Sequence, residues 1–104
     1  MANRADLDQL LRTITNNVYY QPPVNTNMVY PCIRYSRTSI TNQHADNMVY
    51  KQTIAYEIIV IDRNPDSSIV EAVSNIPGIR FNTHYVSEGL NHDRFTLHWY
   101  GNKN

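Results

Sequence analysis

The sequence has little cysteine, little glycine and no long apolar run. Its one cysteine, Cys32, excludes an intrachain disulfide and with it the disulfide-stapled secreted scaffolds. The first residues lack the apolar stretch of a signal peptide, and no segment approaches the roughly 20 apolar residues of a membrane helix. We therefore expect a protein that is made and folded in a reducing cytoplasm and has no membrane partner.

An excess of either charge is also missing. Nine basic and nine acidic residues cancel, and no two basic residues are adjacent. A dedicated nucleic-acid binder normally has a basic excess, because phosphate contacts dominate its affinity. Tight, sequence-independent DNA binding is therefore not expected. A small nucleic-acid-binding module, with Tyr85 and Trp99 stacking on bases, is kept as a remote alternative.

The length of 104 residues fits one domain, 1–104. Eight tyrosines supply much of its apolar surface. A tyrosine ring is apolar and its hydroxyl needs a partner, which suits half-buried surfaces and protein interfaces. Tyrosines are also ordinary strand formers, so this composition favours assembly only weakly.

Two segments have helical periodicity. The first is predicted over 5–16, with Asn3 as its N-cap. The second is predicted to begin with Asn64 as cap and Pro65 in the first helical position, and to end at Pro77-Gly78. The apolar stripes consist of Leu7, Leu10, Leu11 and Ile14 in the first helix and Ile69, Val73 and Ile76 in the second.

Strand signals appear over 32–37, 51–62, 79–85 and 95–100, with 51–62 as the central strand. The piece Val18-Tyr19-Tyr20 reads as a short extended lead into Pro22-Pro23, since paired prolines cannot sit in a central strand. The predicted fold class is α+β, in the order α-β-β-α-β-β. It has a four-stranded, mostly antiparallel sheet with both helices packed on one face.

Two connections stand out. Residues 38–48 are almost all polar and contain no glycine or proline, which favours a long loop or a protruding hairpin. Residues 87–93 read as a turn-rich connection around Gly89.

Candidate chemistry is sparse. His84, His92 and Asp93 invite a metal reading, and a small metallohydrolase built on them is a remote alternative, but their spacing matches no metal motif. Surface or hydrogen-bonded histidines fit better. Cys32 has no sequence cue of activation and reads as a small buried hydrophobe, and Ser67 and Ser68 read as helix-start residues. We expect no cofactor, no metal and no enzymatic activity.

Glu57 lies within the predicted central strand, where an isolated carboxylate would be costly to bury. We expect it to face a rim, a partner subunit, or an arginine of a neighbouring strand, with Arg34 and Arg80 as candidates.

Several segments carry a family resemblance. They are spread over about four-fifths of the chain and keep the order that they have in the family. The most specific are Asp-Arg-Asn-Pro-Asp-Ser over 62–67 and Leu-Asn-His-Asp over 90–93. The complete set is 18–23, 28–35, 45–47 with Tyr50, 60–67, 84–86, 90–93 and 95–97. In combination they resemble the small tail-terminator (tail-completion) proteins of siphophages and of prophages of Gram-positive hosts.

The resemblance implies a virion structural protein of the tail and neck, made in the bacterial host cytoplasm. Such subunits are similar in forming a ring, expected to be a hexamer, that caps the tail tube and ends its polymerisation. The implied partners are other copies of the chain, the tail tube protein and the head–tail connector protein, with DNA only passing through the channel. Another neck protein, a head-closure or connector-adaptor ring, is the main alternative.

A head-to-tail interface that closes by rotation makes a ring, and a sheet edge or long arm can build it. We expect the segment 37–50 to reach a neighbouring subunit, with Asp46 and Asn47 making polar contacts, and 87–93 to be a second contact. Asn91, His92 and Asp93 are equally well explained as stabilising a turn. The candidate interface residues are Thr38, Ile40, Asn42, His44, Asp46, Asn47, Tyr50, Asn91, His92 and Asp93.

Overall fold

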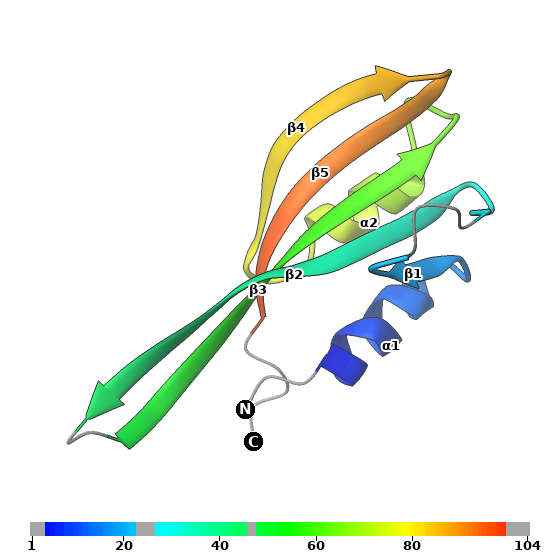
Figure 1. Ribbon diagram of the computed structural model, residues 1–104. Helices are drawn as coiled ribbons and strands as arrows, with labels where there is room; N and C mark the ends of the chain where they lie inside the picture. The colour runs from blue at the N-terminus through cyan, green and yellow to red at the C-terminus, as the bar shows by residue number, and fades with distance from the viewer. Residues whose placement is uncertain (1–3, 23–26, 46–47, 100–104) are drawn as a thin grey trace.

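A computed structural model describes residues 4–22, 27–45 and 48–99, with the backbone alone described for 41–45 and 48–52. The elements are α1 (Arg4–Ile14), β1 (Val18–Tyr20), β2 (Cys32–Ala45), β3 (Met48–Asp62), α2 (Ser68–Ser74), β4 (Ile79–Ser87) and β5 (Leu90–Trp99) (Figure 1).

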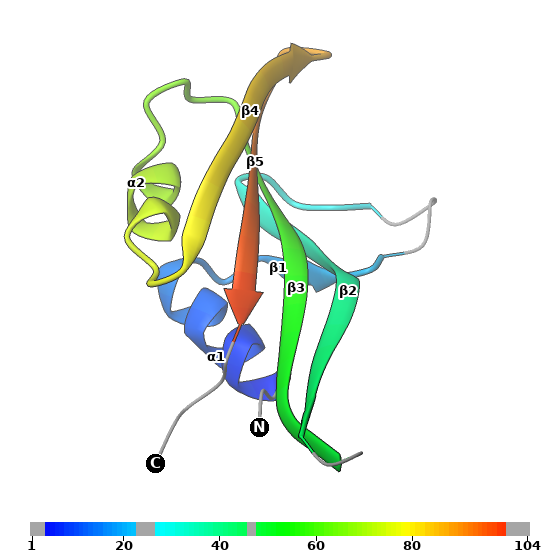
Figure 2. The same ribbon diagram turned by 90° about the vertical axis from the view of Figure 1, so that its left-hand side faces the viewer.

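The strands form one five-stranded mixed sheet in the order β1-β2-β3-β5-β4. β1 runs parallel to β2, and all other neighbours are antiparallel. Both helices lie on the same face of this sheet (Figure 2). The α+β class is confirmed. The prediction of four strands is wrong, because the sheet has a fifth strand, the parallel edge strand β1.

β1 was missed because Pro22 follows it closely. Proline excludes a central strand, but it leaves room for a three-residue edge strand that ends at Tyr20. The backbone N–H of Gln21 still donates to the Tyr35 carbonyl at 2.9 Å, so the pairing continues one residue past β1.

The hydrophobic core lies between the sheet and the two helices. α1 contributes Leu7 and Leu11, and α2 contributes Ile69 and Val73, as the apolar stripes predict. β1, β2, β3 and β5 contribute residues of one face, because successive side chains of a strand point to opposite faces. These sheet residues are Val18, Ile33, Tyr35, Ile54, Tyr56, Ile58, Val60, Phe95 and Leu97. The central strand is therefore β3, as expected.

The helix starts differ from the prediction. The proposed cap Asn3 lies outside the described residues. α2 begins later than expected, with Ser67 as N-cap, whose Oγ accepts from the Ile69 backbone N–H at 3.2 Å. Asn64 instead holds the preceding turn, where its Oδ1 accepts from the Asp66 N–H at 2.9 Å. No helix among the described residues is long and apolar enough to cross a membrane.

β2 and β3 make a hairpin much longer than the rest of the sheet. The β5 strand accompanies β3 only as far as the pair Ile54–Trp99. Beyond it, residues 41–45 and 48–53 pair only with each other among the described strands, and they project from the body as a two-stranded ribbon (Figure 1). We call these residues the hairpin arm. The alternative of a protruding hairpin over 38–48 is thus confirmed, and that of a long loop is wrong.

β4 and β5 are joined by a turn shorter than predicted. Ser87 pairs with Leu90, and the two residues between them, Glu88 and Gly89, have φ of +53° and +77°. Positive φ at both positions is the geometry of a type I′ turn, which favours glycine. Residues 90–93 therefore belong to β5, and the prediction of a loop over 87–93 is wrong there.

A β-bulge interrupts the pairing of β4 between Phe81 and Thr83. Phe81 lies opposite Phe95 on the helix-covered face, but Thr83 lies opposite Arg94 on the uncovered face. The extra residue, Asn82, shifts every later side chain of β4 to the other face. The strict alternation predicted from Ile79 to Tyr85 therefore fails at Asn82.

Candidate functional site

The predicted interface residues of the arm region lie on β2 and β3. Thr38 sits at a register irregularity of β2, and its hydroxyl donates to the Ala55 carbonyl at 3.1 Å. Ile40 is exposed, at 46% of its surface. Asn42 and His44 lie on the β2 strand of the hairpin arm.

Tyr50 lies on the β3 strand of the hairpin arm. Asp46 and Asn47 lie outside the described residues, so their predicted polar contacts stay a prediction.

The side chain of Asn91, in contrast, makes hydrogen bonds within its own chain. It is 9% exposed on β5, and its Nδ2 donates to the carbonyls of Asp62 and Arg63, at 3.2 Å each. These two carbonyls start the turn between β3 and α2. Asn91 therefore does stabilise a turn, but one that is distant in sequence.

The sheet separates His92 from the other two residues, His84 and Asp93. His84 Nδ1 lies 2.9 Å from Asp93 Oδ1 on the helix-covered face. His92 is on the uncovered face, where its ring stacks on Tyr85 with centroids 4.6 Å apart and planes 8° from parallel. Among the described residues no group of three histidine, cysteine or acidic side chains is arranged to hold a metal. The metal set considered from the sequence is therefore not formed.

Glu57 pairs with an arginine of a neighbouring strand, as expected, but this arginine is not one of the two candidates. Arg94 of β5 donates to Glu57 Oε2 through Nε, at 3.0 Å, and through a terminal nitrogen as well. Arg94 lies opposite Ile59, one diagonal step from Glu57. Neither Arg34 nor Arg80 is the partner found. Arg94 could be predicted as the partner of Glu57 only if the register of β3 against β5 were known.

Cys32 is 0% exposed at the start of β2 and is a free thiol. Burial raises the pKa of the thiol to about 11, because the thiolate would lose its hydration. A thiol in this setting is a poor nucleophile at neutral pH, as the sequence predicts.

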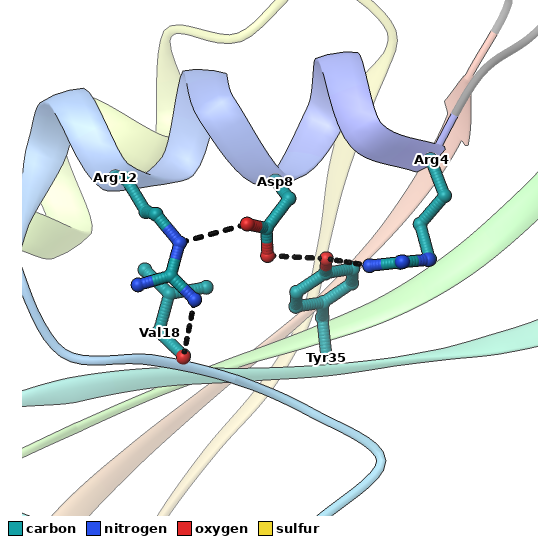
Figure 3. A network of polar contacts seen from close by, with 5 residues as sticks. All are labelled: Arg4, Asp8, Arg12, Val18 and Tyr35. Carbon is teal, nitrogen blue, oxygen red and sulfur yellow. Dashed lines mark hydrogen bonds and ion pairs between the residues drawn. The ribbon is translucent and has the colours of Figure 1, made fainter.

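Sequence reasoning missed a polar network that joins α1 to the sheet (Figure 3). The Tyr35 hydroxyl of β2 donates to Asp8 Oδ1 at 2.6 Å and accepts from Arg4 Nη1 at 3.1 Å. The other Asp8 oxygen accepts from Arg12 Nε at 2.7 Å, and Arg12 also donates to the Val18 carbonyl of β1 at 3.3 Å. Helix α1 is thus tied to both β1 and β2. The Asp8–Arg12 spacing was the only visible sequence signal.

The network shifts the pKa values of its members. Burial would raise the pKa of the Asp8 carboxyl, but hydrogen bonds from Tyr35 and Arg12 outweigh it and leave the pKa below its ordinary value. Burial, followed by the hydrogen bond to Asp8, raises the pKa of Tyr35 well above its usual range. The hydroxyl therefore stays protonated and keeps donating to a charged carboxylate.

A search of protein-family models and of curated proteins finds no match to this chain.

Proposed function

We propose that this chain is a structural subunit that assembles head to tail into a ring. The observation that carries the proposal is the hairpin arm, in which β2 and β3 continue as a two-stranded ribbon beyond the last pair with β5. The molecule measures 52 Å in its longest direction against 29 and 23 Å in the others. An arm of this kind reaches well past the body that it belongs to.

The arm is a structure that needs a partner. An isolated two-stranded hairpin is at best marginally stable in water, because it has no third strand and no helix to pack on. Contact with a neighbouring subunit would supply that packing. A heterologous contact, from the arm of one copy to the body of the next, generates a ring when the rotation closes.

The identity of the ring follows from the sequence resemblance to phage tail-terminator proteins. On that basis the ring caps the tail tube, ends its polymerisation and meets the head–tail connector protein. It would be a virion component, with DNA only passing through its channel. The chemistry of the described side chains supports a structural role, since the polar groups around Tyr35 and Asn91 serve to hold the fold.

The test is a mass measurement by light scattering on the purified chain, alone and then with assembled tail tubes, followed by electron microscopy. The proposal expects a ring, either free or at one end of a tube. A chain that forms no ring and ignores tube ends would refute it. Rings that bind the portal-side connector and not tubes would assign the chain to another neck position instead.

A further inference from the structure

Large apolar side chains are exposed at a few sites in the described part of the chain, and most of these sites lie on two strands. The exposed residues are Val29, Ile40, Phe81, Tyr85 and Val86. All except Val29, which belongs to a connection, lie on β2 or β4. The apolar surface that the fold leaves uncovered is therefore concentrated on strands that end the sheet or project from it.

Three of these side chains share one face of the sheet. Ile40 lies opposite Ile54, whose side chain is in the core. Phe81 and Val86 lie opposite buried residues of β5. Because directly paired residues point to the same face, all three are on the helix-covered side.

β4 is an edge strand with little protection. It ends the sheet next to β5, and eight of its nine residues are exposed. Natural edges are usually blunted by lysine, proline or bulges. Here the charged Arg80 and the bulge at Asn82 both belong to the first half, so residues 83–87 form a regular, open edge that carries Tyr85 and Val86.

The opposite margin of the sheet has an open edge too. β1 pairs only with residues 33–35 of β2. From residue 38 to residue 45, no described strand lies against the outer side of β2. This stretch carries the exposed Ile40.

The two open edges have opposite strand directions. β2 is antiparallel to β3, β3 to β5 and β5 to β4, so β4 runs against β2. A rotation about an axis along the strands keeps these directions. The β4 edge of one copy therefore meets the β2 edge of the next as an antiparallel neighbour, with the helix-covered faces on the same side.

We propose that residues 83–87 of β4 pair edge to edge with residues 38–45 of β2 from a second copy of this chain. The inference rests on the proposed ring and names its contact surface. Main-chain hydrogen bonds would join the sheets, and Val86 would pack against Ile40 of the second copy. The offset between the two edges along the strands would be taken up by strand tilt, as in barrels.

Two variants that each block one edge test the pairing. Val86→Lys blocks β4 and leaves β2 open, whereas Ile40→Lys blocks β2 and leaves β4 open. Each should weaken self-association at least about tenfold, because a valine- or isoleucine-sized contact is lost and a charge is desolvated. An equimolar mixture of both retains one intact pair of edges, so it should form a complex of twice the 12.1 kDa chain mass and grow no further.

The matched control is Val29→Lys. Val29 is 60% exposed and Val86 is 62% exposed, but Val29 lies on neither edge. This control should associate like the wild type. Circular dichroism and thermal unfolding establish that all three variants are folded before masses are compared.

Four results would overturn the pairing. They are a mixture that stays single-chain, either edge variant associating like the wild type, a wild type that stays single-chain at about 1 mM, and unchanged hydrogen exchange of the 83–87 amides between dilute and assembled wild type. A wild type that caps tail tubes yet fails these tests would leave the proposed function standing. A chain that pairs head to tail but does not bind tubes would support the pairing and refute the proposed function.

Discussion

The Tyr35 hydroxyl donates a 2.6 Å hydrogen bond to Asp8 Oδ1, which joins the second strand of the sheet to the first helix. The two residues are 27 positions apart, and the tyrosine is 1% exposed. A short bond from a buried hydroxyl to a carboxylate is a charge-assisted contact, stronger than a neutral one. It fixes where α1 lies on the sheet.

Tyr35→Phe should therefore lower the free energy of unfolding by about 1–3 kcal/mol, the usual effect of losing a hydrogen bond to a charged group. The ring remains in the core, so the loss is the hydroxyl alone. Chemical denaturation monitored by circular dichroism measures it. The matched control is Tyr19→Phe, whose hydroxyl accepts from the exposed Val29 N–H at 3.0 Å and should matter less. Equal losses for both variants would contradict this account.

Asp8 should make stability depend on pH in the acid range. Its folded-state pKa lies below the ordinary value of 3.8, so folding favours the ionised form of the Asp8 carboxyl. The resulting stabilisation is complete above pH 3.8 and is lost as the pH falls through the folded-state pKa. In the Asp8→Asn variant, the free energy of unfolding should depend less steeply on pH over that window.

The control for this titration is Asp6→Asn, an acidic residue of the same helix with no hydrogen bond to Tyr35 found in the structure. This variant keeps the bond between Asp8 and Tyr35, so it should still lose the stabilisation due to Asp8 as the pH falls. A profile for Asp8→Asn as steep as the wild type's would mean that other carboxylates govern acid unfolding.

Cys32 should resist alkylation in the folded protein. Its thiol is fully buried and its pKa is raised to about 11, so almost no thiolate exists at pH 8. Iodoacetamide labelling followed by mass spectrometry should give little product in buffer and complete product in denaturant. Fast labelling of folded protein would show that the start of β2 opens readily.

Much of the fold could be predicted from the sequence, because the segments that form the core have a strong apolar periodicity. Leu7, Leu11, Ile69 and Val73 lie on their predicted stripes, and β3 is the predicted central strand. These patterns work because burial of one helix face or one strand face leaves a direct trace in composition.

The remaining features depend on register, which composition does not record. The bulge at Asn82 turns His84 toward Asp93 and Tyr85 toward His92, so the predicted faces of β4 are reversed in its second half. Likewise, Arg94 reaches Glu57 only because β5 pairs with β3 in one particular offset. A single extra residue or a slip of one position would change each of these contacts.

The hairpin arm should be dispensable for folding and essential for assembly. Replacing residues 41–53 by Asn-Gly joins Ile40 to Ile54, which already face each other, through a two-residue turn of the kind that hairpins favour. The described core residues all lie outside the removed stretch, so the free energy of unfolding should change by less than about 1 kcal/mol. Light scattering and electron microscopy should then find a folded single chain that forms no ring. A control that keeps the arm length but replaces Ile40 by valine should still assemble, because the apolar contact persists. Intact rings from the shortened chain would instead locate the subunit contact on the body of the protein and leave the arm without a role in assembly.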